Sequence, residues 1–124
     1  MTLFEECREA LCADFHIVEG QAKQVVVGIL NKYPRVKGNV SWSEIKYSDY
    51  ESVDELLNKN TIINDDVFVF VDDASIPIFR TKLSLIAGNI YDVTALSPKL
   101  FIFNNEIIIR PLFPSDNFRL GINQ

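Results

Sequence analysis

The sequence predicts an α+β fold in which N-terminal helices precede a mostly antiparallel sheet, with one or two further helices packed on that sheet. Three observations predict it. Apolar residues recur at helical spacing near the N-terminus, a strongly apolar segment of strand-forming residues lies mid-chain, and a hairpin pattern lies near the C-terminus. No repeat, low-complexity tract or Pro/Gly/Ser-rich linker interrupts the chain, so we expect a single domain over residues 1–124.

Two helices are expected in the first quarter of the chain. The first opens at Thr2, whose spacing to Glu5 matches a capping box, and it presents an apolar face. The second spans residues 19–32 and should end before Pro34, because the residue preceding a proline is disfavoured in the helical region. Its buried face is expected to comprise Ala22, Val25, Val26, Ile29 and Leu30.

A turn, a strand and a short helix are expected next. The turn is Lys37-Gly38-Asn39, and residues 40–47 then read as a strand. Trp42 and Ile45 have opposite parity in that strand, which predicts a bulge. The short helix covers residues 52–60 and begins with a second capping-box spacing.

The central segment is the most apolar part of the sequence. Residues 67–71 are Val and Phe alone, so this strand is expected to be covered on both faces. Residues 78–87 are predicted to form a helix that ends at Gly88. Residues 90–95 alternate weakly between apolar and polar and are predicted to form a strand.

A hairpin is expected over residues 100–109, where two apolar runs flank Asn104-Asn105. Both asparagines tolerate the positive φ of a two-residue hairpin turn. Pro111 and Pro114 are expected to end the second strand or to place it at the edge of the sheet.

The negative charge is concentrated in the middle of the chain. The formal net charge is −5, yet residues 44–73 hold nine acids and two bases, whereas the rest of the chain is slightly positive. Binding nucleic acid requires clustered Lys and Arg, so we expect no direct nucleic-acid partner. A basic protein is the more suitable partner for such a segment.

The expected compartment is the cytoplasm. The first residues carry four charged side chains where a secretory signal needs an apolar stretch, and the longest apolar runs are about five residues, so no membrane span is expected. The two cysteines, Cys7 and Cys12, point away from each other on a helix and are expected to be buried free thiols.

The sequence offers little catalytic chemistry. His16 is the only histidine, and its neighbours do not suggest a catalytic arrangement, so a local hydrogen bond or a surface position is expected. The pairs Asp65-Asp66 and Asp72-Asp73 lie too far apart along a strand to share one ion. No phosphate loop, zinc spacing or nucleophile elbow is present. We therefore expect no enzyme, no cofactor and no metal.

A protein interface is expected where aromatic and acidic side chains alternate. Tyrosines bury large areas at a small entropic cost, and carboxylates can pair with a partner's Lys or Arg. In the alternative, Trp42 and Tyr47 belong to the core and the carboxylates form a solvated face. The predicted interface residues are Glu44, Tyr47, Asp49, Tyr50, Glu51, Asp72 and Asp73.

The layout of the later two-thirds of the chain resembles that of immunity proteins from contact-dependent growth inhibition (CDI) systems. The similar segments are residues 42–47, residues 52–59, Asp66-Val-Phe-Val-Phe-Val-Asp-Asp73 and the stretch from Ser97 to Pro111. The resemblance implies a cytoplasmic protein that binds a toxin domain delivered by neighbouring cells. Many such toxins are nucleases with basic clefts, which an acidic protein is suited to occupy.

Two other functions stay open from the sequence. One is a small-molecule-binding or regulatory module that self-associates through an exposed strand after Ile107. The other is a hydrolase that uses Asp72 or Asp73, which requires a cleft that holds both beside His16.

Overall fold

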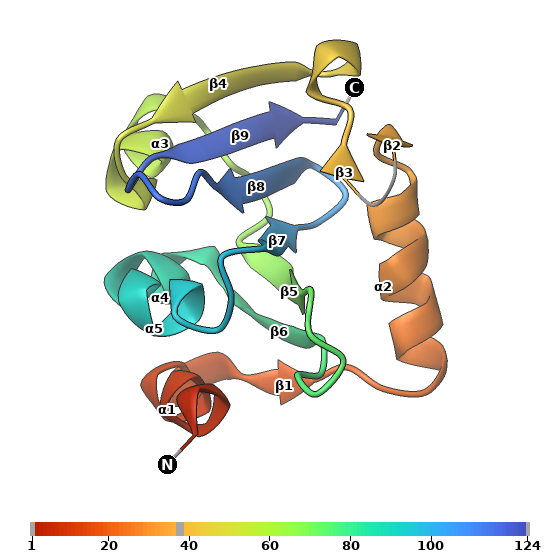
Figure 1. The fold of residues 1–124 in the computed structure, drawn as a ribbon, viewed down its shortest axis with the longest axis vertical. Helices are drawn as coiled ribbons and strands as arrows, with labels where there is room; N and C mark the ends of the chain where they lie inside the picture. Colours follow the sequence, from red (N-terminus) through yellow and green to blue (C-terminus); the bar gives the residue numbers. More distant parts are fainter. Residues whose placement is uncertain (1, 37–38, 124) are drawn as a thin grey trace.

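The computed structural model describes residues 2–36 and 39–123, and its centre is a twisted antiparallel sheet (Figure 1). In the described part of the chain this sheet has seven strands in the order β1-β6-β5-β7-β8-β9-β4. The strands are β1 (His16–Ile17), β4 (Lys46–Tyr50), β5 (Asp66–Val71), β6 (Phe79–Lys82), β7 (Leu100–Phe103), β8 (Ile107–Pro111) and β9 (Phe118–Ile122). A small second sheet pairs β2 (Arg35–Val36) with β3 (Asn39–Val40).

Helices cover both faces of the large sheet, which confirms the predicted α+β class (Figure 1). The α-helices are α1 (Leu3–Ala10), α2 (Gln21–Asn31), α3 (Val53–Lys59), α4 (Leu83–Gly88) and α5 (Ile90–Thr94). Helices α1, α3, α4 and α5 contribute buried residues to the core on one face, and α2 contributes to the core on the other face (Figure 1). Two 3-10 turns, η1 (Cys12–Asp14) and η2 (Trp42–Glu44), link neighbouring elements.

Two hydrophobic cores result, one on each face of the sheet, and β5 contributes to both. Val67, Val69 and Val71 are buried in the core beneath the four helices. Phe68 and Phe70 are half-buried and pack into the core beneath α2. Full burial of one Val side chain contributes roughly 1.5–3 kcal/mol to the stability of the fold. The prediction that this strand is covered on both faces is therefore confirmed.

The N-cap hydrogen bond of each predicted capping box forms. The backbone N–H of Glu5 donates to the Thr2 hydroxyl at 3.1 Å, and that of Glu55 donates to the Ser52 hydroxyl at 3.0 Å. Each bond satisfies an N–H group that lacks a partner within its helix. The side chain of Glu55 in turn accepts from the N–H of Glu51 at 2.8 Å.

The predicted buried face of α2 was too wide. Val26 and Leu30 are buried and Ile29 is half-buried, but Ala22 and Val25 are exposed. The reason is that α2 packs against the sheet alone, so only the side chains directed at the sheet are covered (Figure 1).

Two secondary-structure predictions were wrong between residues 78 and 95. Residues 79–82 form strand β6, because Phe79 and Thr81 alternate with Arg80 and Lys82 between the buried and the half-exposed side of the sheet. The helix begins only at Leu83. Residues 90–94 form α5 instead of a strand, and this helix packs against α1 and α4. Tertiary contacts here outweigh the local preference of β-branched residues for strands.

The predicted strand over residues 40–47 is interrupted by η2 and resumes as β4. The 3-10 turn places Trp42 and Ile45 in the same core, which resolves their opposite parity. Both side chains lie over Gly121 of β9, where a Cβ atom would come within 2.5 Å of Ile45 Cδ1 and 2.9 Å of Trp42. Of the predicted turn before it, Lys37 and Gly38 lie outside the described residues.

The predicted hairpin forms as β7 and β8, but its connection covers residues 104–106 instead of the predicted two-residue turn at Asn104-Asn105. Asn104 is buried, and its side-chain oxygen accepts from the N–H groups of Glu106 and Ile107 at 2.7 and 3.0 Å. Strand β8 ends at Pro111, as predicted, but it is not an edge strand because β9 pairs with its other side. The exposed strand proposed after Ile107 for self-association is therefore absent from the described residues.

The edges of the large sheet are instead β1 and the longer β4. In the part of the chain that the structure describes, no helix combines the length and the apolarity that a membrane crossing requires. Cys7 is buried and Cys12 is exposed, so the expectation of burial is confirmed only for Cys7. Burial, together with nearby Asp92, raises the pKa of the Cys7 thiol to about 12.

Candidate functional site

The residues predicted for an interface fall into three groups. Glu44, in η2, is exposed at the start of β4. Tyr47, Asp49, Tyr50 and Glu51 follow on β4 or immediately after it. Asp72 and Asp73 come directly after β5, at the same end of the sheet as Glu51 but four strands away, roughly 19 Å at the usual strand spacing.

Tyr47 and Asp49 take part in an intramolecular cluster on the face of the sheet that carries α2. Asp49 accepts two hydrogen bonds from the Arg119 guanidinium on the neighbouring strand, at 2.8 and 3.1 Å. The same guanidinium lies 4.6 Å from the ring centroid of Tyr47 and 5.5 Å from that of Trp42. The hydrogen bond from Arg119 lowers the pKa of Asp49. These groups already have partners within the chain.

Tyr50 points to the opposite face of the sheet, because side chains alternate along a strand. Its ring packs against the core beneath the four helices, and its hydroxyl accepts from Asn60 at 3.0 Å. Glu51 follows the end of the strand, is exposed, and lies on the same face with the start of α3 and with α5. The predicted interface residues of β4 are thus divided between two faces and do not form one surface.

Asp72 and Asp73 are exposed, and both have local partners. Asp72 lies 3.5 Å from the Lys99 ammonium. Asp73 accepts from the hydroxyl and the N–H of Ser75 at 2.7 and 2.9 Å, which lowers the pKa of Asp73. A carboxylate that accepts from its own turn stabilises that turn, so Asp73 has a structural role where it stands.

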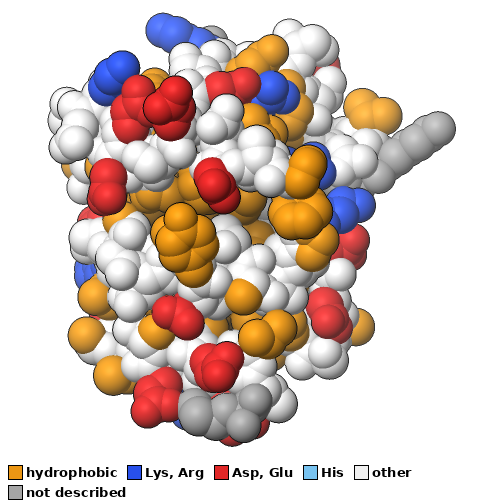
Figure 2. All heavy atoms as spheres, turned by 60° about the vertical axis from the view of Figure 1, so that its left-hand side comes forward, with side chains coloured by type: hydrophobic (Ala, Val, Ile, Leu, Met, Phe, Trp, Pro, Cys, Tyr) orange, Lys and Arg blue, Asp and Glu red, His pale blue; other side chains and the backbone are white. Residues whose placement is uncertain are grey.

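A cleft of about 380 Å³ lies on the face of the sheet that carries α3, α4 and α5. Its walls are the start of α3, the outer side of α4 and α5, and the turn between β8 and β9 at residues 112–117. Its exposed lining is more apolar than polar. Figure 2 shows this face, where hydrophobic side chains are bordered by acidic ones above and below.

Two aromatic side chains stand exposed in the walls of this cleft. Tyr91, on α5, is 76% exposed, and Phe113, in the turn after β8, is 71% exposed. Large apolar side chains that remain this exposed in a concave region are typical of binding sites.

Three carboxylates also line the cleft, from Glu51, Asp54 and Asp116. Among residues 2–36 and 39–123, no Lys, Arg or His lines it, and none forms an ion pair with these three groups. Asp54 lies in the first turn of α3, where the helix dipole favours a negative charge. The cleft therefore combines an apolar floor with uncompensated negative charge.

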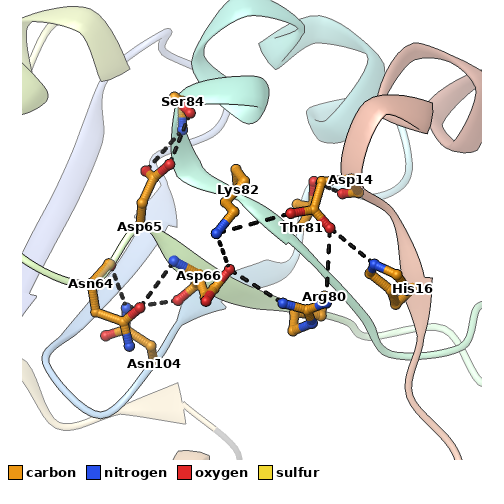
Figure 3. Close-up of polar contacts among 10 residues, drawn as sticks. All are labelled: Asp14, His16, Asn64, Asp65, Asp66, Arg80, Thr81, Lys82, Ser84 and Asn104. Atoms are coloured by element: carbon orange, nitrogen blue, oxygen red, sulfur yellow. Dashed lines mark hydrogen bonds and ion pairs between the residues drawn. The ribbon is translucent and has the colours of Figure 1, made fainter.

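Acidic groups at the other edge of the sheet are compensated (Figure 3). Asp66 contacts the Lys82 ammonium at 2.6 Å and the Arg80 guanidinium at 3.2 Å, and these contacts lower the pKa of Asp66. Asp14 lies 3.0 Å from His16 and 3.8 Å from Arg80. Thr81 donates to the Asp14 carbonyl at 2.6 Å. This network ties β1 and η1 to strands β5 and β6.

Figure 3 also shows what His16 does. It stands exposed on the edge strand and pairs with Asp14, as the sequence predicted. Asp72 and Asp73 contact Lys99 and Ser75 instead, and neither they nor His16 lines the cleft described above, so the arrangement that the hydrolase hypothesis requires is not found there. Within the described residues no group of three or more His, Cys, Asp and Glu side chains is arranged to hold a metal ion.

Sequence reasoning included Glu51 but missed the rest of the cleft. Asp54 lies in a helix's first turn, where an acid has a local structural explanation, and Tyr91 falls in the segment that was wrongly predicted as a strand. A usable signal existed for Phe113 and Asp116. They lie in Pro-Leu-Phe-Pro-Ser-Asp-Asn, a turn-like stretch in which an aromatic residue has no core to enter.

Comparison with known proteins places the chain in one family. The family model described as CdiI immunity protein EcoliA0-like matches residues 1–121, nearly the whole chain. No curated protein matches the chain.

Proposed function

We propose that this chain, which belongs to the CdiI immunity protein family, neutralises a CDI toxin by binding its toxin domain directly and in equal stoichiometry. The observation that carries the proposal is the family match over residues 1–121. Neutralisation by occupancy needs no catalytic residues in the immunity protein. The site of action is the cytoplasm, where a delivered toxin domain would meet its target.

The toxin is proposed to be a nuclease with a basic cleft. Such an enzyme binds phosphates with clustered Lys and Arg, and a surface of carboxylates can compete for the same groups. The net charge of −5 and the uncompensated carboxylates of the cleft support this choice. Opposite charge also accelerates association, which suits an inhibitor that must act before the toxin does.

Titration calorimetry tests the proposal. The purified toxin domain encoded immediately upstream of this chain is titrated with the immunity protein. The expected result is a single transition at a molar ratio of one with a Kd well below 1 μM. Absence of binding at micromolar concentrations overturns the proposal. In parallel, loss of nucleic-acid cleavage at the same ratio tests whether the toxin is a nuclease.

A second function, a small-molecule-binding regulatory module, is favoured by one observation. The cleft is within the range of roughly 300–1,000 Å³ that is typical of ligand sites, and it is mostly apolar. A thermal-shift screen of cationic amphiphilic compounds distinguishes the two functions. Stabilisation by such a compound without binding to the toxin domain would favour the regulatory module.

A further inference from the structure

The cleft has the two properties that a protein partner's anchor requires. Its aromatic walls, Tyr91 and Phe113, are largely exposed, so a side chain inserted between them would remove a large apolar area from water. The cleft is open to solvent and lies on the face of the molecule that Figure 2 shows, so an extended segment or a loop can reach it.

The negative charge of the cleft indicates which residues flank the anchor in the partner. Glu51, Asp54 and Asp116 come from the end of β4, the first turn of α3 and the β8–β9 turn, and together they line the cleft. In the described part of the chain, no cation compensates them from within. Three carboxylates around an apolar site favour a partner whose own anchor is flanked by Lys or Arg.

We infer that this cleft is the docking site for a basic segment of the toxin domain that presents an apolar, preferably aromatic, side chain between Lys or Arg residues. The inference rests on the proposed function and specifies where on the immunity protein the toxin is held. Tyr91 and Phe113 contact the anchor, and Glu51, Asp54 and Asp116 pair with the flanking cations. The clustered partners Asp49 and Arg119 on the opposite face lie outside this contact.

Two sets of variants test the aromatic and the acidic part separately. The aromatic set is Tyr91→Ala with Phe113→Ala, and its control truncates two exposed apolar residues elsewhere, Val25→Ala with Ile63→Ala. The double cleft variant is expected to raise the Kd for the toxin domain at least about 30-fold, mostly through faster dissociation, as for central interface residues. The control variant is expected to bind like the unmodified protein.

The acidic set is Glu51→Gln, Asp54→Asn and Asp116→Asn. Its control has the same net charge and changes three exposed acids outside the cleft, Glu6→Gln, Glu9→Gln and Glu19→Gln. The cleft variant is expected to slow association about tenfold at low salt and to weaken its salt dependence. The control is expected to change the association rate by less than about threefold, because salt screens the interaction of the toxin domain with charges far from the cleft.

Hydrogen exchange on the unmodified proteins tests the inference without any variant. Residues 51–54, 90–95 and 112–117 are expected to exchange more slowly when the toxin domain is bound. If the unmodified protein binds the toxin but these segments are unprotected, or the cleft variants bind like their controls, the docking site is wrong and the proposed function stands. If the unmodified protein does not bind the toxin domain, both are overturned.

Discussion

Two acidic regions of this immunity protein use the same side chains in opposite ways. At the β1–β6–β5 edge, Asp14 and Asp66 are surrounded by His16, Arg80 and Lys82, and their charge holds neighbouring strands together. In the cleft, the described structure gives Glu51, Asp54 and Asp116 no cationic partner. The first region is satisfied within the chain, whereas no cation within the described residues compensates the second.

This difference shows that the net charge of a segment does not reveal how many of its charged side chains are available to a partner. The acidic stretch over residues 44–73 contains Asp49 and Asp66, which are both held by internal cations. It also contains Glu51 and Asp54, which line the cleft. Asp49 and Glu51 are close neighbours in the sequence, yet their electrostatic roles differ because the fold places them on different faces of the sheet.

The largest expected effect on stability lies outside both acidic regions, in the core beneath α2, and it sets the scale for the comparison. Gly121→Ala places a methyl group against Trp42, Ile45 and Ile108, at distances of 2.5 to 3.0 Å. Overpacking of this kind is expected to destabilise the protein by about 1–3 kcal/mol, because the three neighbours must shift. Urea denaturation followed by tryptophan fluorescence measures the change. An unchanged midpoint would mean that η2 is free to move away from β9.

Neutralising the edge network should come next. Asp14→Asn with Asp66→Asn leaves Arg80 and Lys82 close together without their counter-charges. The expected loss is about 1–2 kcal/mol, since each partly exposed pair contributes up to about 1 kcal/mol. The same denaturation measurement, compared at low and high salt, checks it, and the loss should shrink at high salt.

The pH dependence of stability follows from the same internal pairs. The pKa values of Asp49 and Asp66 are lowered in the folded state by Arg119 and Lys82. The contribution of these two ion pairs to the free energy of unfolding is therefore complete above the unfolded-state pKa of Asp, about 4. It is lost as the pH falls through the lower pKa of the folded state. Both groups are partly exposed, so a combined loss of about 1 kcal/mol is expected between pH 5 and pH 2. A variant with Asp49→Asn and Asp66→Asn should show a flatter profile.

The smallest effect on stability is expected in the cleft. Glu51→Gln, Asp54→Asn and Asp116→Asn together should change the free energy of unfolding by no more than about 0.5 kcal/mol, because no internal cation loses its partner. A loss of 2 kcal/mol or more would show that these carboxylates hold the fold, and the contrast between the two regions would disappear. Combined with weaker toxin binding, an unchanged stability separates binding from folding.

The fold was easier to predict from the sequence than the candidate site, and particular residues show why. Thr2 and Ser52 were recognised as caps because capping depends on residues three positions apart. The cleft joins residues 51–54, 87–98 and 111–118, which no local pattern connects. Asp49 was predicted for an interface, and its pairing with Arg119, 70 residues away, could not be seen in sequence.

By itself, the sequence determined the class of the fold, the capped helices, the apolar central strand and the hairpin, because all of these depend on local spacing and hydrophobic pattern. Tertiary structure alone decided that residues 79–82 pair as a strand and that residues 90–94 form a helix. It also decided which carboxylates have a cation beside them and which do not. The physical reason is that pairing and burial depend on partners distant in the chain, and an acid's availability depends on whether folding brings a cation to it.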